Sequence, residues 1–240
     1  DPDGLAIFRQ LADRADVVVE NFRPDVKFRL GIDYETLRKT NPRIVYASIS
    51  GFGQDGPYAK RAGFDQVAQG MGGLMAITGL PGQGPVRSGI AVSDTSAGLY
   101  CANGVLTALL EREVSGEGQW VRVSLLQAMI AMLDFQAARW LVGKEVPPQA
   151  GNDHPTSIPT GVFQTSDGFI NIAASGQSMW ERLCKAMGAD ALLARLEFAT
   201  NPLRSKNRAQ VNSELAEFTR RKTSAEWIEI FESDRVPSGP

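Results

Sequence analysis

Apolar residues follow two alternating patterns along the first 142 positions of the chain. Short β-branched runs, such as the three valines after Asp16, are typical of parallel strands that are buried on both faces. Between them lie segments with apolar residues at helical spacing, such as Leu5, Phe8 and Leu11. The patterns predict helices at 3–15, 33–39, 64–74, 94–114 and 124–142, and strands at 16–19, 44–49, 89–93 and 120–123. This alternation indicates an α/β fold with a Rossmann-like, doubly wound sheet.

The pattern changes after a segment that is rich in proline. Residues 143–159 contain four prolines and few apolar anchors, as expected for a linker. Beyond them, two strand patterns flank Asp167 and Gly168, a pair that predicts a hairpin turn. Helices are predicted at 178–187, 204–220 and 224–232. We therefore expect a large domain over 1–145, a linker over 146–160 and a smaller α+β domain over 161–240.

Composition removes several classes of function. A net charge of −2 provides no basic footprint for nucleic acid, and no apolar run reaches the roughly 18 residues of a membrane span. With two cysteines, Cys101 and Cys184, and the single histidine His154, neither a disulfide framework nor a zinc site is expected. No glycine-rich nucleotide-binding motif is present. These features favour a cytoplasmic protein, and the two ends of the sequence suggest the middle of a longer chain.

Three of the predicted strands end in polar residues, and ligands of open α/β sheets bind beyond such ends. The first strand leads into residues 20–23, the second into 50–53 and the third into Asp94. If the strands are neighbours, the three clusters share one edge of the sheet. Phe22 could stack on a base and Arg23 could bind phosphate. The alternative for these two residues is an ordinary turn with solvated side chains.

Asp94 is the first candidate for covalent chemistry, because other reactive side chains are scarce. An ionised carboxylate can attack a thioester carbonyl. The plainer explanation is a helix N-cap, a position that favours Asp, and both roles are compatible. At a helix start, the dipole and the amide donors are expected to keep the carboxylate ionised.

Other conspicuous residues have simple structural explanations. His154 is interpreted as a linker residue, and Cys101 as a buried thiol on the apolar face of the helix after Asp94. The basic residues within 204–208 are interpreted as a solvated helix face. The two tryptophans of the smaller domain are expected to anchor its core; they are Trp180 and Trp227.

Six stretches, taken in their order along the chain, resemble the family III CoA-transferases, which include formyl-CoA transferase and the carnitine CoA-transferase. The matching residues are 15–24, 41–46, 48–58, 94–98, 116–119 and 123–126. The resemblance implies an enzyme that moves CoA from an acyl-CoA to a carboxylic acid through an aspartyl-CoA thioester. It also implies an interlocked homodimer, with coenzyme A thioesters as substrates and no permanently bound cofactor or metal.

The resemblance assigns roles to individual residues. Asp94 aligns with the nucleophile of the family, and Asp65 lies at a helix start near the active site. Gly176 and Gln177 occupy the region of a mobile loop of the small domain that is thought to shield the intermediate. Four further residues fall where the family contacts CoA: Asn21, Phe22, Arg23 and Arg29.

Some positions depart from the family pattern and leave alternatives open. Asp25 replaces a usual glycine, and the loop at 175–177 has fewer glycines than in formyl-CoA transferase, which argues against oxalate as acceptor. The related α-methylacyl-CoA racemases pair the aspartate with a histidine, where this chain has Phe64. A racemase-like enzyme and a non-catalytic CoA-binding subunit are the two alternatives.

Overall fold

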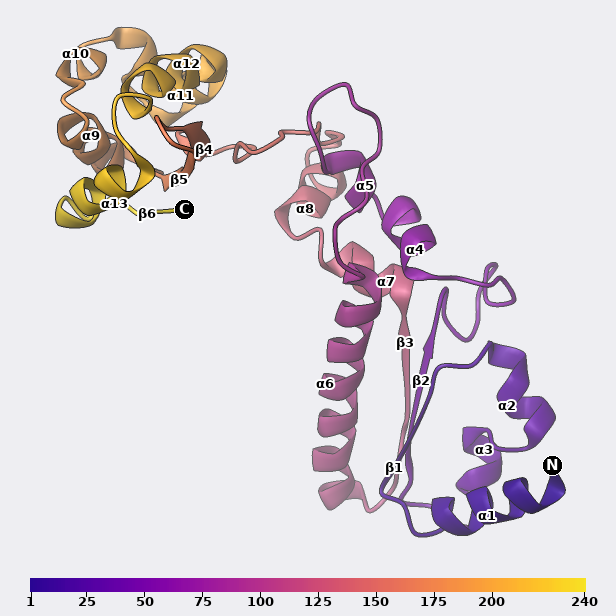
Figure 1. Cartoon of the computed structure of the whole chain (residues 1–240). Coiled ribbons are helices and arrows are strands. Elements are labelled where there is room, and N and C mark those ends of the chain that lie inside the picture. The colour runs from indigo at the N-terminus through magenta and orange to yellow at the C-terminus, as the bar shows by residue number, and fades with distance from the viewer. The chain divides into compact units, whose positions relative to one another are not determined.

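The computed structural model describes residues 1–240 and divides them into two compact units, Asp1–Gln149 and Ala150–Pro240 (Figure 1). Each unit has its own sheet and its own buried core. The fold is mixed α/β, with a parallel sheet in the larger unit and an antiparallel sheet in the smaller one. None of its helices combines the length and the apolar character that crossing a membrane requires.

The larger unit is built on three parallel strands in the order β1-β2-β3. The strands are β1 (Val17–Glu20), β2 (Val45–Ser50) and β3 (Trp120–Ser124). The helices are α1 (Pro2–Ala12), α2 (Pro24–Leu30), α3 (Tyr34–Leu37), α4 (Asp65–Met71), α5 (Leu74–Ile77), α6 (Val92–Ser115), α7 (Leu125–Ala131) and α8 (Phe135–Leu141). Because the strands are parallel, their carboxyl ends meet at one edge of the sheet.

Helices cover both faces of this sheet. Tyr46 and Trp120 belong to a cluster with α1 and α3, whereas Ile49 and Val123 pack with α4, α6 and α7. Figure 1 shows α6 along one side of the strands and α1 to α3 along the other. The central strand β2 is buried on both faces, as predicted for a parallel strand. In the edge strand β1, by contrast, Val19 is 58% exposed, so its predicted burial is wrong.

The hydrophobic pattern misses α2, although the boundaries of this helix carry recognisable signals. Pro24 lies in the first turn, and Gly31 ends the helix in the left-handed conformation with φ 62°. Seven residues give too few apolar repeats to show helical periodicity. The helix also buries a charge, because the Lys27 side chain is completely enclosed.

Two further predictions for the larger unit are wrong. The run at 89–93 pairs with no strand, Ile90 is 66% exposed, and α6 already begins at Val92. The single helix predicted at 124–142 is two helices, because Asp134 adopts φ 50° between α7 and α8. A residue with left-handed backbone interrupts a right-handed helix.

The smaller unit has an antiparallel sheet in the order β4-β5-β6. Its first two strands form the hairpin that was predicted around Asp167 and Gly168. Trp180 and Trp227 are confirmed as core residues. The elements are β4 (Thr160–Gln164), β5 (Phe169–Ala173), α9 (Gln177–Ala186), α10 (Asp190–Leu193), the 3-10 helix η1 (Leu196–Phe198), α11 (Asn201–Lys206), α12 (Arg208–Thr219), α13 (Ser224–Ser233) and β6 (Ser238–Gly239).

Arg204 contradicts the prediction of a solvated basic face at 204–208. Its side chain is completely buried. The Nε atom donates to the Ile158 carbonyl at 3.1 Å, and Nη1 donates to the Phe198 carbonyl at 2.8 Å. The guanidinium also lies 5.1 Å from the centroid of the Trp180 ring. Arg204 therefore acts as an internal cross-link of the smaller unit.

Candidate active site

The carboxyl edge of the parallel sheet gathers the polar ends of all three strands. Glu20, Ser50 and Ser124 end β1, β2 and β3, and Ser50 lies opposite Ser124 in the register. The start of α6 lies at the same edge, where α6 packs against α4 and α7 (Figure 1). Asp94 therefore lies at the sheet edge, although no strand leads into it.

Asp94 is the third residue of α6 and not its N-cap, which corrects the sequence interpretation. The N-cap is Ala91, whose side chain offers no hydrogen-bond acceptor. Asp94 is exposed, so its carboxylate is accessible to a ligand. An acidic residue in the first turn still lies at the positive end of the helix dipole.

Asp65, the first residue of α4, supplies the cap that Ala91 lacks. Its Oδ1 accepts hydrogen bonds from the Ser93 amide at 3.0 Å and from the Ser93 hydroxyl at 2.6 Å. Its Oδ2 accepts from Gln69 Nε2 at 2.7 Å and from Arg87 Nη2 at 3.3 Å. The Asp65 side chain is buried, so the structure joins one enclosed and one exposed carboxylate at the start of α6.

The two carboxyl groups have pKa values shifted in opposite directions. Partial burial raises the pKa of the Asp94 carboxyl, and the negative charge of Asp65 raises it further. Hydrogen bonds from helix amides, which were expected to favour the ionised form of Asp94, are not among the influences on this pKa. Burial would also raise the pKa of Asp65, but the hydrogen bonds from Ser93 and Gln69 and the charge of Arg87 outweigh it and lower that pKa. Asp65 consequently stays ionised at a lower pH than Asp94.

A second set of predicted residues lies around α2. Asn21, Phe22 and Arg23 follow β1 with exposed side chains, and Arg29 is exposed on α2. The Phe22 amide donates to Glu20 Oε2 at 2.8 Å, which fixes the turn between β1 and α2. Their exposure makes these side chains available to a ligand, at the end of β1.

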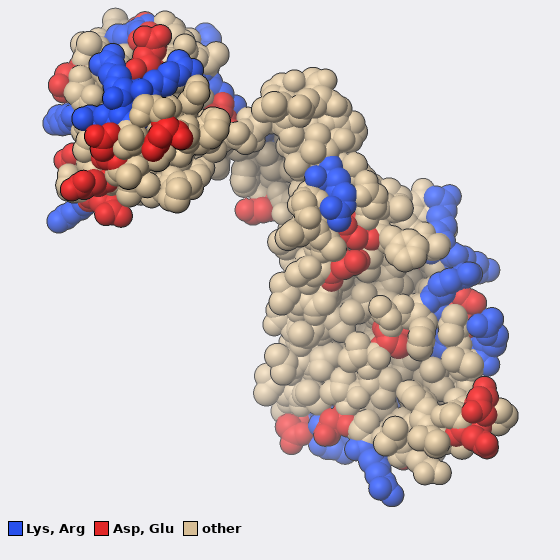
Figure 2. Space-filling view, viewed as in Figure 1, with Lys and Arg blue, Asp and Glu red and all other residues tan.

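A hollow of about 360 Å³ adjoins this turn. Arg23 and Phe28 line it from the α2 side, and Gln54 and Lys60 line it from the loop after β2. Figure 2 shows basic side chains gathered along this side of the larger unit. Phe28 and Lys60 were not predicted, because one lies on the missed helix and the other in an irregular loop. The hollow combines cations with an aromatic ring.

A buried ion pair ties the walls of this hollow to the sheet. Lys27 Nζ lies 3.1 Å from Glu20 Oε1, and both side chains are almost completely enclosed. The same ammonium group contacts Gln54 Oε1 in the loop after β2. Lys27 therefore joins α2 and this loop to the end of β1.

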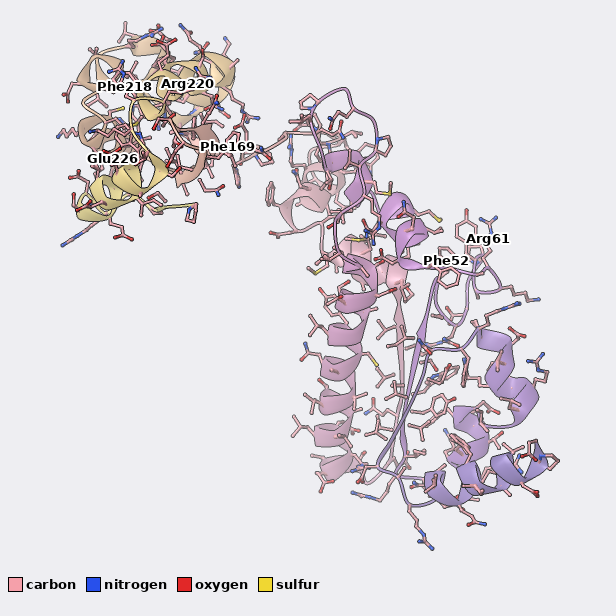
Figure 3. All side chains as sticks on the ribbon, in the orientation of Figure 1. Phe52, Arg61, Phe169, Phe218, Arg220 and Glu226 are labelled. Carbon is pink, nitrogen blue, oxygen red and sulfur yellow. The ribbon has the colours of Figure 1, made fainter.

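The loop between β2 and α4 is pinched at its base. Gly51 and Gly63 approach so closely that a Cβ atom on Gly51 would lie 2.6 Å from the Gly63 Cα. Within the loop, the Phe52 and Tyr58 rings meet edge to face at 5.8 Å, and the Arg61 guanidinium lies 4.0 Å from the Tyr58 centroid. Figure 3 shows Phe52 and Arg61 in this loop. The loop adds another cation and further aromatic surface to this side of the unit.

Gly176 and Gln177 lie in the smaller unit, at the start of α9. Gly176 has φ 86° and ψ 169°, a conformation that is essentially restricted to glycine. Gln177 Oε1 accepts a hydrogen bond from Arg204 Nη1 at 3.1 Å, and its Nε2 donates to Glu181 at 3.1 Å. The buried arginine therefore holds the residue that follows Gly176.

Fold and site together define the class of protein. It is an α/β protein with an exposed carboxylate at a helix start and, at the same sheet edge, a basic hollow with an aromatic wall. The chain belongs to CoA-transferase family III, which it matches over residues 1–240. The resemblance recognised in the sequence is thereby confirmed.

Known proteins similar to the chain include two named CoA-transferases. It is 38% identical over 239 residues to the succinate–glutarate CoA-transferase of Agrobacterium fabrum, and the aligned region covers 100% of this chain and 60% of that protein. It is 35% identical over 240 residues to the human succinyl-CoA:glutarate CoA-transferase, with coverage of 100% and 55%. The crystal structure of a CaiB/BaiF family protein from Brucella suis aligns with TM-score 0.86 and 37% identity, covering 100% of this chain and 64% of that one. The chain thus spans 55% to 64% of the length of these proteins.

Proposed function

We propose that the complete protein carrying this sequence transfers CoA from an acyl-CoA thioester to a carboxylic acid, with Asp94 as the nucleophile. The observation that carries this proposal is the exposed Asp94 carboxylate in the first turn of α6, beside the enclosed Asp65. Family membership and the activities named for the relatives support CoA transfer.

The chemistry requires only carboxylates and a thiolate. An Asp94 oxygen attacks the thioester carbon of the donor, the C–S bond breaks, and CoA thiolate leaves behind a mixed anhydride. The thiolate attacks the Asp94 carbonyl carbon and releases the donor acid, which leaves an aspartyl-CoA thioester. The acceptor carboxylate attacks this carbon and expels the thiolate again. The thiolate then takes the acyl carbon of the acceptor and restores the Asp94 carboxylate. No proton is gained or lost, so no histidine is needed.

The residues around α2 would hold the CoA moiety. Arg23 and Lys60 line the hollow, and Arg29 is exposed on α2; Arg and Lys are the side chains that phosphate groups favour. Phe22 and Phe28 are exposed aromatic rings on which an adenine base can stack. Asn21 offers an amide donor next to them.

We further propose, on the resemblance to the family, that Gly176 and Gln177 close over the intermediate. On the same basis, the complete protein is proposed to have a Rossmann-like larger domain and to work as an interlocked homodimer.

A trapping experiment tests the nucleophile. The complete protein is incubated with a set of acyl-CoA thioesters, quenched with hydroxylamine and mapped by peptide mass spectrometry. We expect a hydroxamate on the peptide that contains Asp94, and no such modification in Asp94→Asn.

The same experiment separates the alternatives. A modified peptide elsewhere would contradict the role of Asp94 while leaving acyl transfer in place. Binding of CoA without any adduct would favour the non-catalytic subunit. Exchange of the α-proton of a 2-methylacyl-CoA without an adduct would favour the racemase-like enzyme. The absence of a histidine beside Asp65, where Phe64 stands, argues against that last outcome.

A further inference from the structure

In the proposed transfer, an anionic acceptor must approach negatively charged residues at the start of α6. The following inference rests on that proposed function. The acceptor is an anion, and it must approach a point where two carboxylates already lie close together. The negative charge of Asp65 is strong enough at Asp94 to raise the pKa of that carboxyl. Like charges disfavour the approach of a third anion, so a cation beside them would assist the entry of the acceptor.

Arg87 is the cation at this point of the structure. Its Nη2 lies 3.3 Å from Asp65 Oδ2, and its side chain is 41% exposed. Its Nη1 donates to the Ser88 carbonyl at 2.8 Å. A guanidinium has five N–H donors in a planar fork, so these two bonds leave the rest of the fork available. Figure 2 shows basic and acidic surface side by side near the start of α6.

The segment that carries Arg87 is held in place by a buried glutamine. Gln69 is completely enclosed, and its Oε1 accepts a hydrogen bond from the Ser88 amide at 3.0 Å. Its Nε2 donates to Asp65 at 2.7 Å and to the Ile90 carbonyl at 3.1 Å. The residues on both sides of Gly89 are therefore anchored to α4. A cation on a fixed segment loses little freedom when it binds an anion, which favours recognition.

The position of Arg87 points to a charge other than the reacting one. Arg87 pairs with Asp65, with its Nη2 3.3 Å from Oδ2, and no hydrogen bond or ion pair joins it to Asp94. An arginine bound to the reacting carboxylate would also withdraw negative charge from the oxygen that must attack. A second carboxylate on the same substrate would satisfy the arginine and leave the reacting carboxylate free.

We propose that Arg87 binds the distal carboxylate of a dicarboxylic acid substrate while the other end reacts at Asp94. Asp65 and Gln69 act as positioning residues for the arginine. Dicarboxylic acids and their mono-CoA thioesters are thus the substrate class of this site. Monocarboxylic acids of the same length lack the group that Arg87 recognises.

The test compares two five-carbon acceptors, glutarate and valerate, with succinyl-CoA as the donor and the complete protein as the enzyme. In the wild-type protein we expect glutarate to be the better acceptor. In Arg87→Met we expect the KM for glutarate to rise about ten- to a hundredfold, because a charge-assisted pair is lost. The KM for valerate should change by less than about twofold. Arg87→Lys, which keeps the charge, should recover part of the preference for glutarate.

Arg43→Met is the matched control. Arg43 is half exposed and pairs with Glu113 at 3.0 Å, beyond the opposite end of the sheet, before β2 begins. It should leave both KM values unchanged. Equal effects of Arg87→Met on both acceptors, or an unchanged KM for glutarate, would overturn the role of Arg87 while the transferase proposal stands. If the wild-type protein transfers CoA to neither acid and gains no adduct on Asp94, both proposals fail.

Discussion

Replacing Asp65 by asparagine tests whether this carboxylate caps α6 and tunes Asp94. Asparagine preserves the shape and can still accept from Ser93, but it removes the charge and turns one acceptor into a donor. That donor would face Gln69 Nε2 and Arg87 Nη2, which now donate to Asp65 Oδ2. Hydrogen bonds to charged groups contribute about 1.5–3 kcal/mol. Because both hydrogen bonds from Ser93 would then go to a neutral group, we expect the start of α6 to lose about 2 kcal/mol of local stability, or roughly thirtyfold in its opening equilibrium.

Hydrogen exchange followed by mass spectrometry measures this loss on the complete protein. Peptides from the first turn of α6, which include the Ser93 amide, should exchange roughly thirtyfold faster in Asp65→Asn. Asp33→Asn is the matched control, because Asp33 is also buried and caps α3 by accepting from the Thr36 amide at 3.1 Å. That substitution should speed exchange in α3 and leave α6 unchanged.

The same variant has a defined effect on pH dependence. Removing the charge of Asp65 lowers the pKa of Asp94, because that charge now raises it. The acid limb of adduct formation should consequently move to lower pH. The pKa of Asp65 itself is lowered on folding, so its stabilisation is present above its unfolded pKa and is lost as pH falls through the folded pKa. Unchanged exchange at α6, or an acid limb that moves to higher pH, would refute the reasoning.

Three further substitutions have expected outcomes. Arg29→Ala should weaken CoA binding about ten- to a hundredfold in calorimetry, since a charge-assisted phosphate contact is lost; an unchanged dissociation constant would remove this residue from the site. Arg204→Leu should destabilise the smaller unit by about 2–4 kcal/mol in urea unfolding, because buried carbonyls lose their donor, whereas the exposed Lys206→Leu should have little effect. Gly51→Ala should lower thermal stability through its clash with the facing backbone, whereas Gly98→Ala, which meets open space inside α6, should not.

Elements with repeating local patterns could be predicted from the sequence. β2, β3 and the hairpin of β4 and β5 were found within a residue or two, because their apolar runs and turn residues are contiguous. α2 was missed because its evidence lies in its boundary residues, Pro24 and Gly31. The false strand at 89–93 shows the limit of such patterns, since a short apolar run is compatible with an exposed loop.

The burial of charged side chains could not be predicted from the sequence, for a different reason. Arg204 has the same spacing and neighbours as a solvated helix arginine. Its burial depends on carbonyl groups at Ile158 and Phe198, which only the folded chain brings to it. Lys27 is similar, because its partner Glu20 and its contact Gln54 come from two other elements.

The difference between local sequence patterns and contacts made only in the folded chain also applies to Asp65 and Asp94. Asp94 could be recognised from its local sequence. Its surroundings, however, include Asp65, which lies 28 positions before Ser93 in the sequence and accepts a hydrogen bond from the Ser93 amide. The Asp65 carboxylate accepts four hydrogen bonds. These bonds hold its negative charge in place and make its oxygens less available for reaction. Asp94 receives no side-chain partner from that network and stays exposed, so its carboxylate is accessible for the proposed attack. A single carboxylate held as tightly as Asp65 would be a poor nucleophile, and one left as free as Asp94 could not order the helix start. Two carboxylates, with one arginine to balance them, allow both properties in one place.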